Sequence, residues 1–403
     1  MDKIYYFDNA ATTFPKSENV KKAMIEAIQQ GYGNAGRGSY KMAAESVKIQ
    51  DRLREKLLER SGSQNGGHVV LTSGATIAFN MLLGGIRLNA ESTVYVSPFE
   101  HNAVIRVLYA KQKHIKFAIK ELPITDDGLM IDLEKTEYEF LMQAPDLVCV
   151  SNISNVTGYI LPIDEICHLA KSSNKKAITV VDGCQAMGLI SKPLLNNTSI
   201  DYYVFAGHKT LYGPFGIGGF ICNTLFSEEI LRNRHFYQPY LCGGTGSDSL
   251  NMDMNTDEPE MLEIGSMDIL AVAGLLAALE GNPEELDINS DYGYKKEKEH
   301  TERLVSMLRE IDGVHLYIPN DIEKHISIVS FNIDGYTCQE VGMIFDEDYH
   351  IAVRTGYHCA PLVHRYLKDN VFNGTVRASI GRYTTEEELE YFVQAVKELS
   401  EEG

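Results

Sequence analysis

The residues best suited to chemistry lie in the stretch DYYVFAGHKTLYGPFGIGGF, residues 201–220. An apolar run of the kind that lies buried in a parallel sheet is followed here by Gly-His-Lys. Because Lys209 leaves the end of a buried strand, we expect its amine to be partly desolvated, and such a free amine is nucleophilic enough to form a Schiff base with a carbonyl group. The glycines that follow let the backbone pass close to a bulky group beside the lysine. The stretch therefore predicts covalent catalysis by Lys209.

Two plainer interpretations of this stretch stay open. A lysine at a strand end is most often a solvated surface residue, and GPFGIGG is compatible with a simple tight turn. A nucleotide-binding loop is excluded, however. Such a loop needs Gly-Lys-Ser/Thr at the start of a helix, whereas these glycines lead into the strand-like run 220–222.

The surrounding sequence, from residue 68 to residue 222, alternates short apolar runs with segments of helical length. Strands are expected at 68–73, 93–98, 115–119, 147–153, 177–183, 202–207 and 216–222, with helices at about 75–87, 100–112, 129–142 and 163–173. This alternation predicts an α/β fold with a doubly wound, mostly parallel sheet of seven strands. Ligands bind such sheets beyond the carboxyl ends of the strands. Polar groups converge there, at residues 73–76, 100–102, 154–155, 182–185 and 207–209.

The flanking segments indicate a two-domain plan. Helices are expected at 17–30 and 43–60 before the sheet and at 269–279 after it, with an irregular segment at 223–265. The acidic stretch 282–290 is expected to lead into a smaller α+β domain with strands at 315–319, 328–333, 351–356 and 375–380. We therefore assign residues 15–282 to a large α/β domain, and residues 1–14 and 283–403 to the small domain.

Capping residues mark the helices of the small domain. A long amphipathic helix is expected at 295–311. Thr337 with Glu340 forms the capping-box pattern of a helix that extends to Phe345. Thr384 and Glu387 are expected to cap the last helix, which extends to about residue 401.

Composition restricts the classes of function. The net charge of −19 over 403 residues argues against nucleic acid, which binds clustered Lys and Arg. No apolar run approaches the ~20 residues that span a bilayer, and the N-terminal sequence lacks a signal-peptide pattern, so a cytoplasmic protein with no membrane partner is expected. The seven cysteines show no C-x-x-C spacing, so neither a disulfide framework nor a metal site is expected. We expect buried, inert thiols at all of them except Cys359.

Seven motifs are spread over nearly the whole chain. They are Asn9-Ala-Ala-Thr12, Glu100-His101, Ser154-Asn-Val-Thr-Gly158, Asp182-Gly-Cys-Gln185, Gly207-His-Lys209, Arg354-Thr-Gly-Tyr-His-Cys359 and Arg377-Ala-Ser379. Their composition and order resemble the pyridoxal-phosphate-dependent cysteine desulfurases, the NifS/SufS-like group of the class V aminotransferases. The resemblance implies fold type I of the pyridoxal-phosphate-dependent transferases, and a homodimer with the cofactor at the subunit interface.

The resemblance also implies roles around the cofactor ring. Lys209 would hold pyridoxal phosphate and would move the α-proton of the substrate as general base and acid. Asp182 would keep the pyridinium nitrogen protonated, so that the ring acts as an electron sink. His101 would stack on the ring face and relay protons. Gln185 would bind the ring hydroxyl, and Asn155 would lie beside the ring substituents or the substrate.

The phosphate of the cofactor is expected at the N-terminus of the helix that begins near Ala75, because free backbone N–H groups and the helix dipole favour an anion. By resemblance, Thr76 and His208 would add side-chain donors, and Ser266 would reach in from the partner subunit. A plain helix cap is the structural alternative for Thr76.

The substrate groups follow from the same resemblance. Arg377 would bind the substrate carboxylate as a bidentate fork, with Arg354 as a second candidate near the substrate or the reactive cysteine. Asn155, Asn9 and Ala10 are assigned to the same substrate site. Either arginine is also compatible with an ordinary ion pair between domains.

Cys359 determines the predicted reaction. It lies in VRTGYHCAPL, a loop that leaves a strand, and positive charge from Arg354 and His358 would favour its thiolate. The resemblance implies that it attacks the sulfur of L-cysteine, giving alanine and a persulfide on Cys359, and that a sulfur-acceptor protein takes the sulfur for a process such as iron–sulfur cluster assembly. A short, fairly rigid catalytic loop is expected.

Four positions depart from the pattern of the resembled group. Ala75 and Ala206 stand where hydroxyl residues that bind the phosphate are usual, and each lost hydrogen bond is worth roughly 0.5–1.5 kcal/mol of cofactor affinity. Ile77 replaces a glutamate and Tyr40 replaces a histidine, so substrate or acceptor preference is expected to have changed.

Other functions stay open beside desulfuration. Selenocysteine lyase activity would use the same site. Another class V reaction, as a lyase, epimerase or aminotransferase, would need Lys209 and Asp182 but not Cys359. A non-catalytic scaffold with the cofactor fold is the third alternative, and the intact set of polar residues argues against it.

Overall fold

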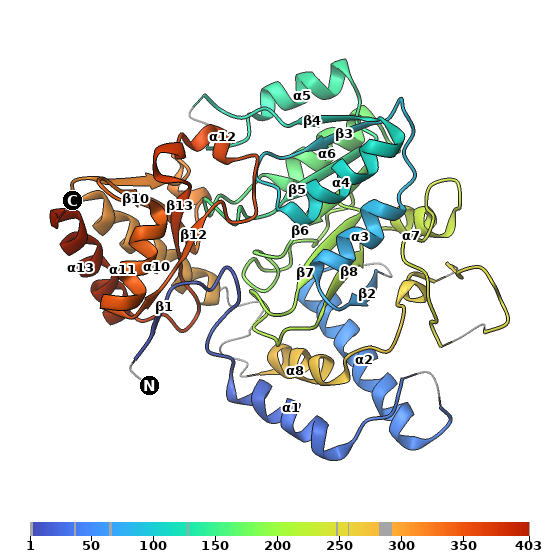
Figure 1. The fold of residues 1–403 in the computed structure, drawn as a ribbon. Helices are drawn as coiled ribbons and strands as arrows, with labels where there is room; N and C mark the ends of the chain where they lie inside the picture. Colours follow the sequence, from blue (N-terminus) through green and yellow to red (C-terminus); the bar gives the residue numbers. More distant parts are fainter. Residues whose placement is uncertain are drawn as a thin grey trace.

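A seven-stranded sheet forms the centre of the large domain (Figure 1). The computed structural model describes residues 3–35, 38–63, 67–126, 129–246, 249–256, 258–281 and 292–402. The strand order is β2 (His68–Thr72), β8 (Gly218–Cys222), β7 (Tyr202–Ala206), β6 (Ile178–Asp182), β5 (Leu147–Ser151), β3 (Thr93–Val96) and β4 (Ala118–Glu121). Strand β8 is antiparallel to both of its neighbours and all other pairs are parallel, so the predicted mostly parallel sheet is confirmed.

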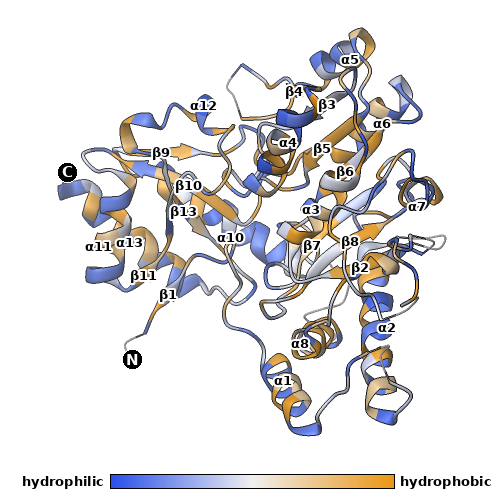
Figure 2. Cartoon of the chain, turned by 45° about the vertical axis from the view of Figure 1, so that its right-hand side comes forward, coloured by the Kyte–Doolittle hydropathy of each residue, from blue (hydrophilic) through white to orange (hydrophobic). Residues whose placement is uncertain are grey.

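Helices cover both faces of this sheet, as the alternating pattern predicts. They are α1 (Glu18–Gln30), α2 (Lys41–Ser61), α3 (Ala75–Gly85), α4 (Asn102–Ile115), α5 (Leu133–Met142), α6 (Ile163–Ser173), α7 (Leu225–Arg232) and α8 (Ile269–Glu280). One core contains side chains of α2, α5, α6 and α8, and the other those of α3, α4 and α7. Figure 2 shows strands β2 and β5 as hydrophobic and the outer helix α1 as mixed, because the strands are buried on both faces whereas the helix has a solvated side.

Three predicted elements of the large domain are wrong in detail. The expected strand at 115–119 starts at Ala118, because residues 102–115 form α4 and Lys116 ends that helix in the left-handed conformation. The helix expected from residue 129 begins at Leu133, after the N-cap Asp132. The segment 223–265 is not irregular throughout. It contains α7, capped by Thr224, and the 3-10 turn η1 (Pro259–Leu262).

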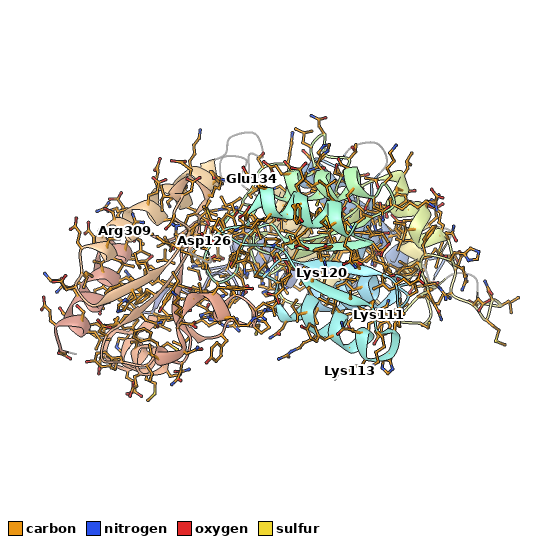
Figure 3. The ribbon with its side chains drawn as sticks, turned by 90° about the horizontal axis from the view of Figure 1, so that it is seen from above. Lys111, Lys113, Lys120, Asp126, Glu134 and Arg309 are labelled. Carbon is orange, nitrogen blue, oxygen red and sulfur yellow. The ribbon has the colours of Figure 1, made fainter. Side chains whose placement is uncertain are left out.

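The small domain combines two sheets with three long helices. Strands β12 (Arg354–Gly356), β13 (Thr375–Ser379), β10 (Ile328–Ile333) and β9 (Val314–Tyr317) form an antiparallel sheet in that order. Strand β1 (Tyr5–Tyr6) pairs in parallel with β11 (Ile351–Ala352). Helices α10 (Tyr292–Arg309), α11 (Cys338–Tyr349) and α13 (Glu386–Glu402) contribute to the core of this domain, and α12 (His364–Leu367) is a short turn. Seen from above, the two domains lie side by side, with Arg309 on the small one and Lys111 on the large one (Figure 3).

The predicted capping box of Thr337 and Glu340 is confirmed, although its helix extends to Tyr349. The cap of the last helix is one residue later than expected. The Glu388 amide donates to Thr385 Oγ1 and the Thr385 amide donates to a Glu388 carboxylate oxygen. The strand expected at 351–356 is two short strands with different partners, β1 and β13.

The connection at 282–290 and the assigned boundary between residues 282 and 283 lie outside the described residues. The large domain is here the part packed around the seven-stranded sheet and the small domain the part packed around the four-stranded sheet, and the residue bounds of this division stay a prediction. Within the described ranges, no helix combines the length and the apolar character that crossing a membrane requires.

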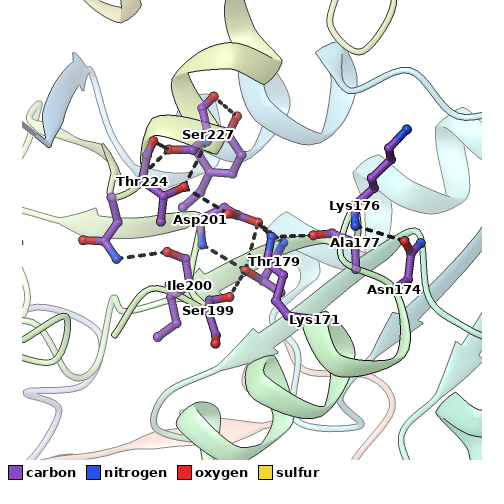
Figure 4. Close-up of polar contacts among 12 residues, drawn as sticks. Lys171, Asn174, Lys176, Ala177, Thr179, Ser199, Ile200, Asp201, Thr224 and Ser227 are labelled. Atoms are coloured by element: carbon purple, nitrogen blue, oxygen red, sulfur yellow. Dashed lines mark hydrogen bonds and ion pairs between the residues drawn. The ribbon is translucent and has the colours of Figure 1, made fainter. Parts of the chain in front are cut away.

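One buried carboxylate, Asp201, joins three elements at the start of β7 (Figure 4). Its side chain is 1% exposed and lies 2.6 Å from the Lys171 ammonium of α6. It also accepts hydrogen bonds from the Thr179 amide of β6 (2.9 Å) and from Thr224 Oγ1 at the start of α7 (3.2 Å). Because a buried charge is costly unless it is paired and hydrogen-bonded, this arrangement fixes the entry of β7 into the sheet.

Replacing Asp201 with Asn is expected to lower the free energy of unfolding by about 2–4 kcal/mol, because the Lys171 ammonium loses its counterion. The measurement is the urea midpoint by circular dichroism. The matched control is Asp51→Asn, which removes an exposed carboxylate while its partner Arg54 keeps the ion pair with Glu263, and which should change stability by less than about 1 kcal/mol. Equal midpoints for Asp201→Asn and the unaltered protein would contradict this account.

Candidate functional site

Three predicted site residues meet beyond the strand ends of the large sheet. Asp182 ends β6, Lys209 lies three residues after β7, and His101 is the N-cap of α4, with its Nδ1 accepting from the Ala103 amide (3.0 Å). Burial and the nearby positive charge of Lys209 lower the pKa of His101 to about 4, and the carboxylate of Asp182 opposes this. The imidazole is therefore neutral near pH 7, between an amine and a carboxylate.

The turn after β6 is built closely around Asp182. Its Oδ1 accepts from the Cys184 amide (2.9 Å). A Cβ at Gly183 would lie 1.9 Å from the Tyr203 ring, so only glycine fits there. Burial raises the pKa of the Cys184 thiol well above its ordinary value, as for an inert packing thiol.

The N-terminus of α3 lies at the same edge and is suited to an anion. The helix begins at Ala75, as predicted, and the first amides of a helix have no partner within the helix. A Cβ at Gly218 would lie 2.9 Å from the Ala75 nitrogen, so a glycine here lets β8 pass beside this helix end. The N-cap is Gly74, and Thr76 is exposed in the first turn. The alternative that Thr76 is the helix cap is therefore wrong.

The backbone of His208 joins the lysine turn to the N-terminal segment. Its carbonyl accepts from Thr12 Oγ1 (3.0 Å), Thr13 Oγ1 (3.2 Å) and Lys16 Nζ (2.8 Å). The His208 ring stacks on Phe215 at 4.7 Å. Burial and the charges of Lys209 and Lys16 lower its pKa to about 4, so it is a neutral donor or acceptor.

Ser266 is exposed, and its hydroxyl accepts from Asn34 Nδ2 (2.9 Å). Its contribution to the site of a second subunit stays a prediction. Three of the positions that differ from the resembled group lie as follows: Ala206 is buried at the end of β7, Ile77 is exposed on α3, and Tyr40 is exposed before α2.

The N-terminal turn lies between the two domains. Gln185 Nε2 donates to the Ala10 carbonyl (2.8 Å), and the Ala10 amide donates to Ser379 Oγ (2.9 Å). Asn9 Nδ2 donates to the Ser379 carbonyl (3.0 Å). Gln185, Ala10 and Asn9 thus lie together, and the Gln185 amide nitrogen donates to the backbone of this turn. Their roles toward the cofactor and the substrate stay predictions.

Arg377 is fully buried beside Asn155. It donates to the Asn155 carbonyl (2.9 Å) and to Asp8 Oδ1 (2.8 Å). Its cross-strand neighbour is Arg354, so two guanidinium groups lie together, an arrangement that favours a bound anion. Asp8 was missed from the sequence, although it directly precedes the Asn9 motif.

Cys359 lies beside a positively charged side chain. Arg354 donates from a terminal nitrogen to its sulfur (3.1 Å). The expectation that His358 supplies charge as well is wrong. His358 Nε2 lies 2.8 Å from Thr375 Oγ1, and burial lowers the pKa of His358 well below its ordinary value, so the ring is neutral.

The backbone of the Cys359 loop has an uncommon conformation, and its rigidity stays a prediction. His358 and Cys359 have φ of 46° and 57°, in the left-handed region that costs a residue with a side chain roughly 1–2 kcal/mol. Asn155 Nδ2 donates to the His358 carbonyl (2.7 Å), and the Asn102 amide donates to the Cys359 carbonyl (2.6 Å). The large domain thus holds this loop at two consecutive residues.

A cavity of about 1100 Å³ is lined by Thr76, His101 and Cys359 and continues between α3 and α4. The predicted nucleophile and the helix end suited to an anion therefore open into one space. Of the other six cysteines, five are buried as expected, but Cys242 is exposed, because it follows no strand or helix that would bury it.

Glu100 is a further titratable group, which the sequence motif Glu100-His101 contains but for which it predicted no role. Its side chain is fully buried, and its Oε1 accepts from Ser97 Oγ and from the Ser151 amide, both at 2.6 Å. Burial raises the pKa of Glu100 to about 8, and the carboxylate of Asp182 adds to the effect. Its position directly before His101, at a strand end, was the available signal.

A family profile described as Aminotransferase class-V matches residues 5–392. The chain belongs to this family. It is 28% identical over 405 residues to a probable cysteine desulfurase of Methanothermobacter thermautotrophicus, covering 99% of this chain and 95% of the relative. It is 28% identical to a cysteine desulfurase of Escherichia coli, covering 98% of this chain and 93% of the relative.

Solved structures of this family have the same fold. The apo structure of a cysteine desulfurase from Thermococcus onnurineus matches with a TM-score of 0.88 at 28% identity, over 99% of this chain and 95% of that one. The cysteine desulfurase CsdA from Escherichia coli matches with a TM-score of 0.82 at 26% identity, over 99% and 95%. The predicted fold, type I of the pyridoxal-phosphate-dependent transferases, is confirmed.

Replacing Glu100 with Gln is expected to remove a loss of stability that the unaltered protein undergoes as pH rises. The free energy of unfolding of the variant, compared with that of the unaltered protein, should therefore increase with pH. The pKa of Glu100 is raised from 4.5 to about 8, so its stabilising effect is present below pH 4.5 and is lost as pH rises through 8. Glutamine has no such dependence. Between pH 5.5 and 8.5, the unfolding free energy of the variant should therefore rise by roughly 2–4 kcal/mol relative to the unaltered protein.

Urea unfolding at both pH values measures this change. The control is Glu59→Gln on α2, which removes an exposed carboxylate paired with Lys56 and should leave the pH dependence unchanged. A constant difference between Glu100→Gln and the unaltered protein would show that Glu100 is ionised throughout this range.

Proposed function

We propose that this chain is a cysteine desulfurase that converts L-cysteine to L-alanine and holds the released sulfur as a persulfide on Cys359. The observation that carries the proposal is the sulfur of Cys359, held by Arg354 at 3.1 Å and open to the cavity that His101 also lines. An inert packing thiol needs neither a guanidinium partner nor an opening to a cavity. The relatives named as cysteine desulfurases support the same activity.

The residues fit pyridoxal phosphate as the cofactor. The free amides at the start of α3, with Thr76 in the first turn, are suited to the phosphate, and Gly218 leaves room at this helix end. His208 would add a side-chain donor. Lys209 and Asp182 would hold the two reactive ends of the ring. When bound, the cofactor supplies the electron sink that weakens bonds at the α-carbon of an amino acid.

Three side chains would act on the substrate, each in a different role. Lys209 takes up and returns the α-proton. The neutral His101, whose Nδ1 accepts from the Ala103 amide, carries its proton on Nε2 and can donate a hydrogen bond or that proton beside the lysine. Arg377 binds the substrate carboxylate through the N–H groups that Asp8 and Asn155 leave free.

The sulfur transfer itself balances without an external oxidant. The thiolate of Cys359 attacks the sulfur of the substrate, a sulfur–sulfur bond forms, and the carbon–sulfur bond breaks. Its electron pair remains with the substrate carbon, which takes up a proton to give alanine. Arg354 stabilises the attacking anion.

We further propose a homodimer with pyridoxal phosphate at the subunit interface, Ser266 contributing to the partner's phosphate site. A cytoplasmic sulfur-acceptor protein would take the persulfide sulfur, for instance toward iron–sulfur cluster assembly. The exposure of Ser266 supports the first point, and the cavity in front of Cys359 supports the second.

Replacing Cys359 with Ser is expected to abolish the persulfide and to lower sulfide and alanine formation from L-cysteine at least ~100-fold, because the hydroxyl does not accept sulfur. The measurement is mass spectrometry for added sulfur on the protein, with parallel assays of sulfide and alanine. The matched control is Cys242→Ser, which removes an exposed cysteine outside the site and should retain full activity.

Full turnover of Cys359→Ser with an added reductant would favour another class V reaction that does not use this thiol. Purified protein that stays colourless after incubation with pyridoxal phosphate would favour the scaffold alternative. Faster turnover of selenocysteine than of cysteine would assign a selenocysteine lyase.

A further inference from the structure

A buried histidine–carboxylate pair lies next to the loop that carries Cys359. His364 Nδ1 and Asp369 Oδ2 are 2.5 Å apart, and the side chains are 4% and 0% exposed. The Asp369 carbonyl also accepts from the Phe372 amide (3.0 Å) and the Gly374 amide (3.3 Å), so the segment after α12 turns around this residue. Neither side chain belongs to the site described above.

The pair is joined to the loop through two rings. The His364 ring packs edge-on against Tyr357, with centroids 5.0 Å apart, and lies 6.1 Å from the His358 ring. His358 is in turn fixed to Thr375 of β13. His358 is therefore buried between β13 on one side and the His364 ring on the other, whereas Tyr357 packs on His364 with one face and stays half exposed.

These contacts surround a backbone conformation that is unfavourable by itself. The consecutive left-handed residues His358 and Cys359 persist only if their surroundings determine that conformation. A buried histidine–carboxylate pair contributes little net stability compared with apolar packing, so a gain in conformational specificity accounts for it better than a gain in stability. The sulfur reaches Arg354 from this one loop conformation.

We propose that the His364–Asp369 pair is a positioning element for Cys359: it holds the Tyr357–His358 side of the loop so that the sulfur stays beside Arg354 and faces the cavity at His101. The proposal deepens the proposed function, because the positioned sulfur is the one that would receive the persulfide. Its geometric part is independent of any reaction.

The geometric part is tested by alkylation of Cys359 in the holoenzyme with two reagents, anionic iodoacetate and neutral iodoacetamide. Arg354 beside the sulfur attracts the anionic reagent, so the ratio of the two rates reports the proximity of the guanidinium. Arg354→Gln supplies the ratio without that charge. We expect Asp369→Asn to lower the ratio at least threefold, toward the Arg354→Gln value.

The functional part is tested by steady-state kinetics with L-cysteine. Asp369→Asn should lower kcat at least tenfold, because the sulfur of Cys359 is no longer held in position. It should change KM less than twofold, because the pair touches neither the lysine turn nor Arg377. If the unaltered protein forms no persulfide on Cys359, the proposed function fails, whereas the alkylation ratio still decides the positioning.

Two controls separate this role from a general effect on folding. Asp334→Asn removes the exposed pair between His315 and Asp334 in the same domain and should change neither readout. The double variant His364→Leu with Asp369→Leu keeps the buried volume and leaves no unpaired charge, so it should fold and still lose the high ratio. An unchanged ratio in the double variant, or an equal loss in Asp334→Asn, overturns the proposal.

Discussion

The ion pair between Asp8 and Arg377 is the contact on which the two-domain site depends. Arg377 is fully buried, and without the carboxylate its charge would be left unpaired in a region where that is costly. The pair brings the N-terminal turn onto β13. The next residues of the same turn then bind Gln185 and the carbonyl of His208 in the large domain. A segment of about six residues thus sets the distance between the arginines and the lysine turn.

The sequence was informative wherever the structure depends on local pattern. The apolar runs predicted the central strands because those strands are buried on both faces, and the polar residues after them predicted the edge at which Lys209, Asp182 and His101 meet. Capping chemistry placed α11 correctly at Thr337, because that signal needs only four residues. The last helix is capped by Thr385 instead of Thr384, an error that adjacent threonines and glutamates make unavoidable.

Long-range contacts caused two further differences. The strand expected at 351–356 is divided because Ile351 pairs with Tyr5, more than 300 residues away, which no local pattern reports. The same holds for side-chain partners. The position of His358 beside Cys359 suggested a second positive charge, yet its ring turns to Thr375, and burial keeps it neutral. The fold and the sheet edge at which Lys209, Asp182 and His101 lie were thus predictable, whereas the ionisation of the histidines was not, and the roles of these residues stay predictions.

Those neutral histidines determine the electrostatics of the site. His101, His208 and His358 all have pKa values lowered by burial, so the positive charge near pH 7 comes from lysine and arginine side chains alone. The protein as a whole carries a net charge of −19, and the cations at the site have few carboxylates beside them apart from Asp8 and Asp182. An amino-acid carboxylate or a phosphate is repelled by the protein at long range, where salt screens the field, and is attracted within the cavity, where screening is weak. The affinity for small anions that the proposed function requires would therefore come from short-range contacts and not from steering by the whole surface.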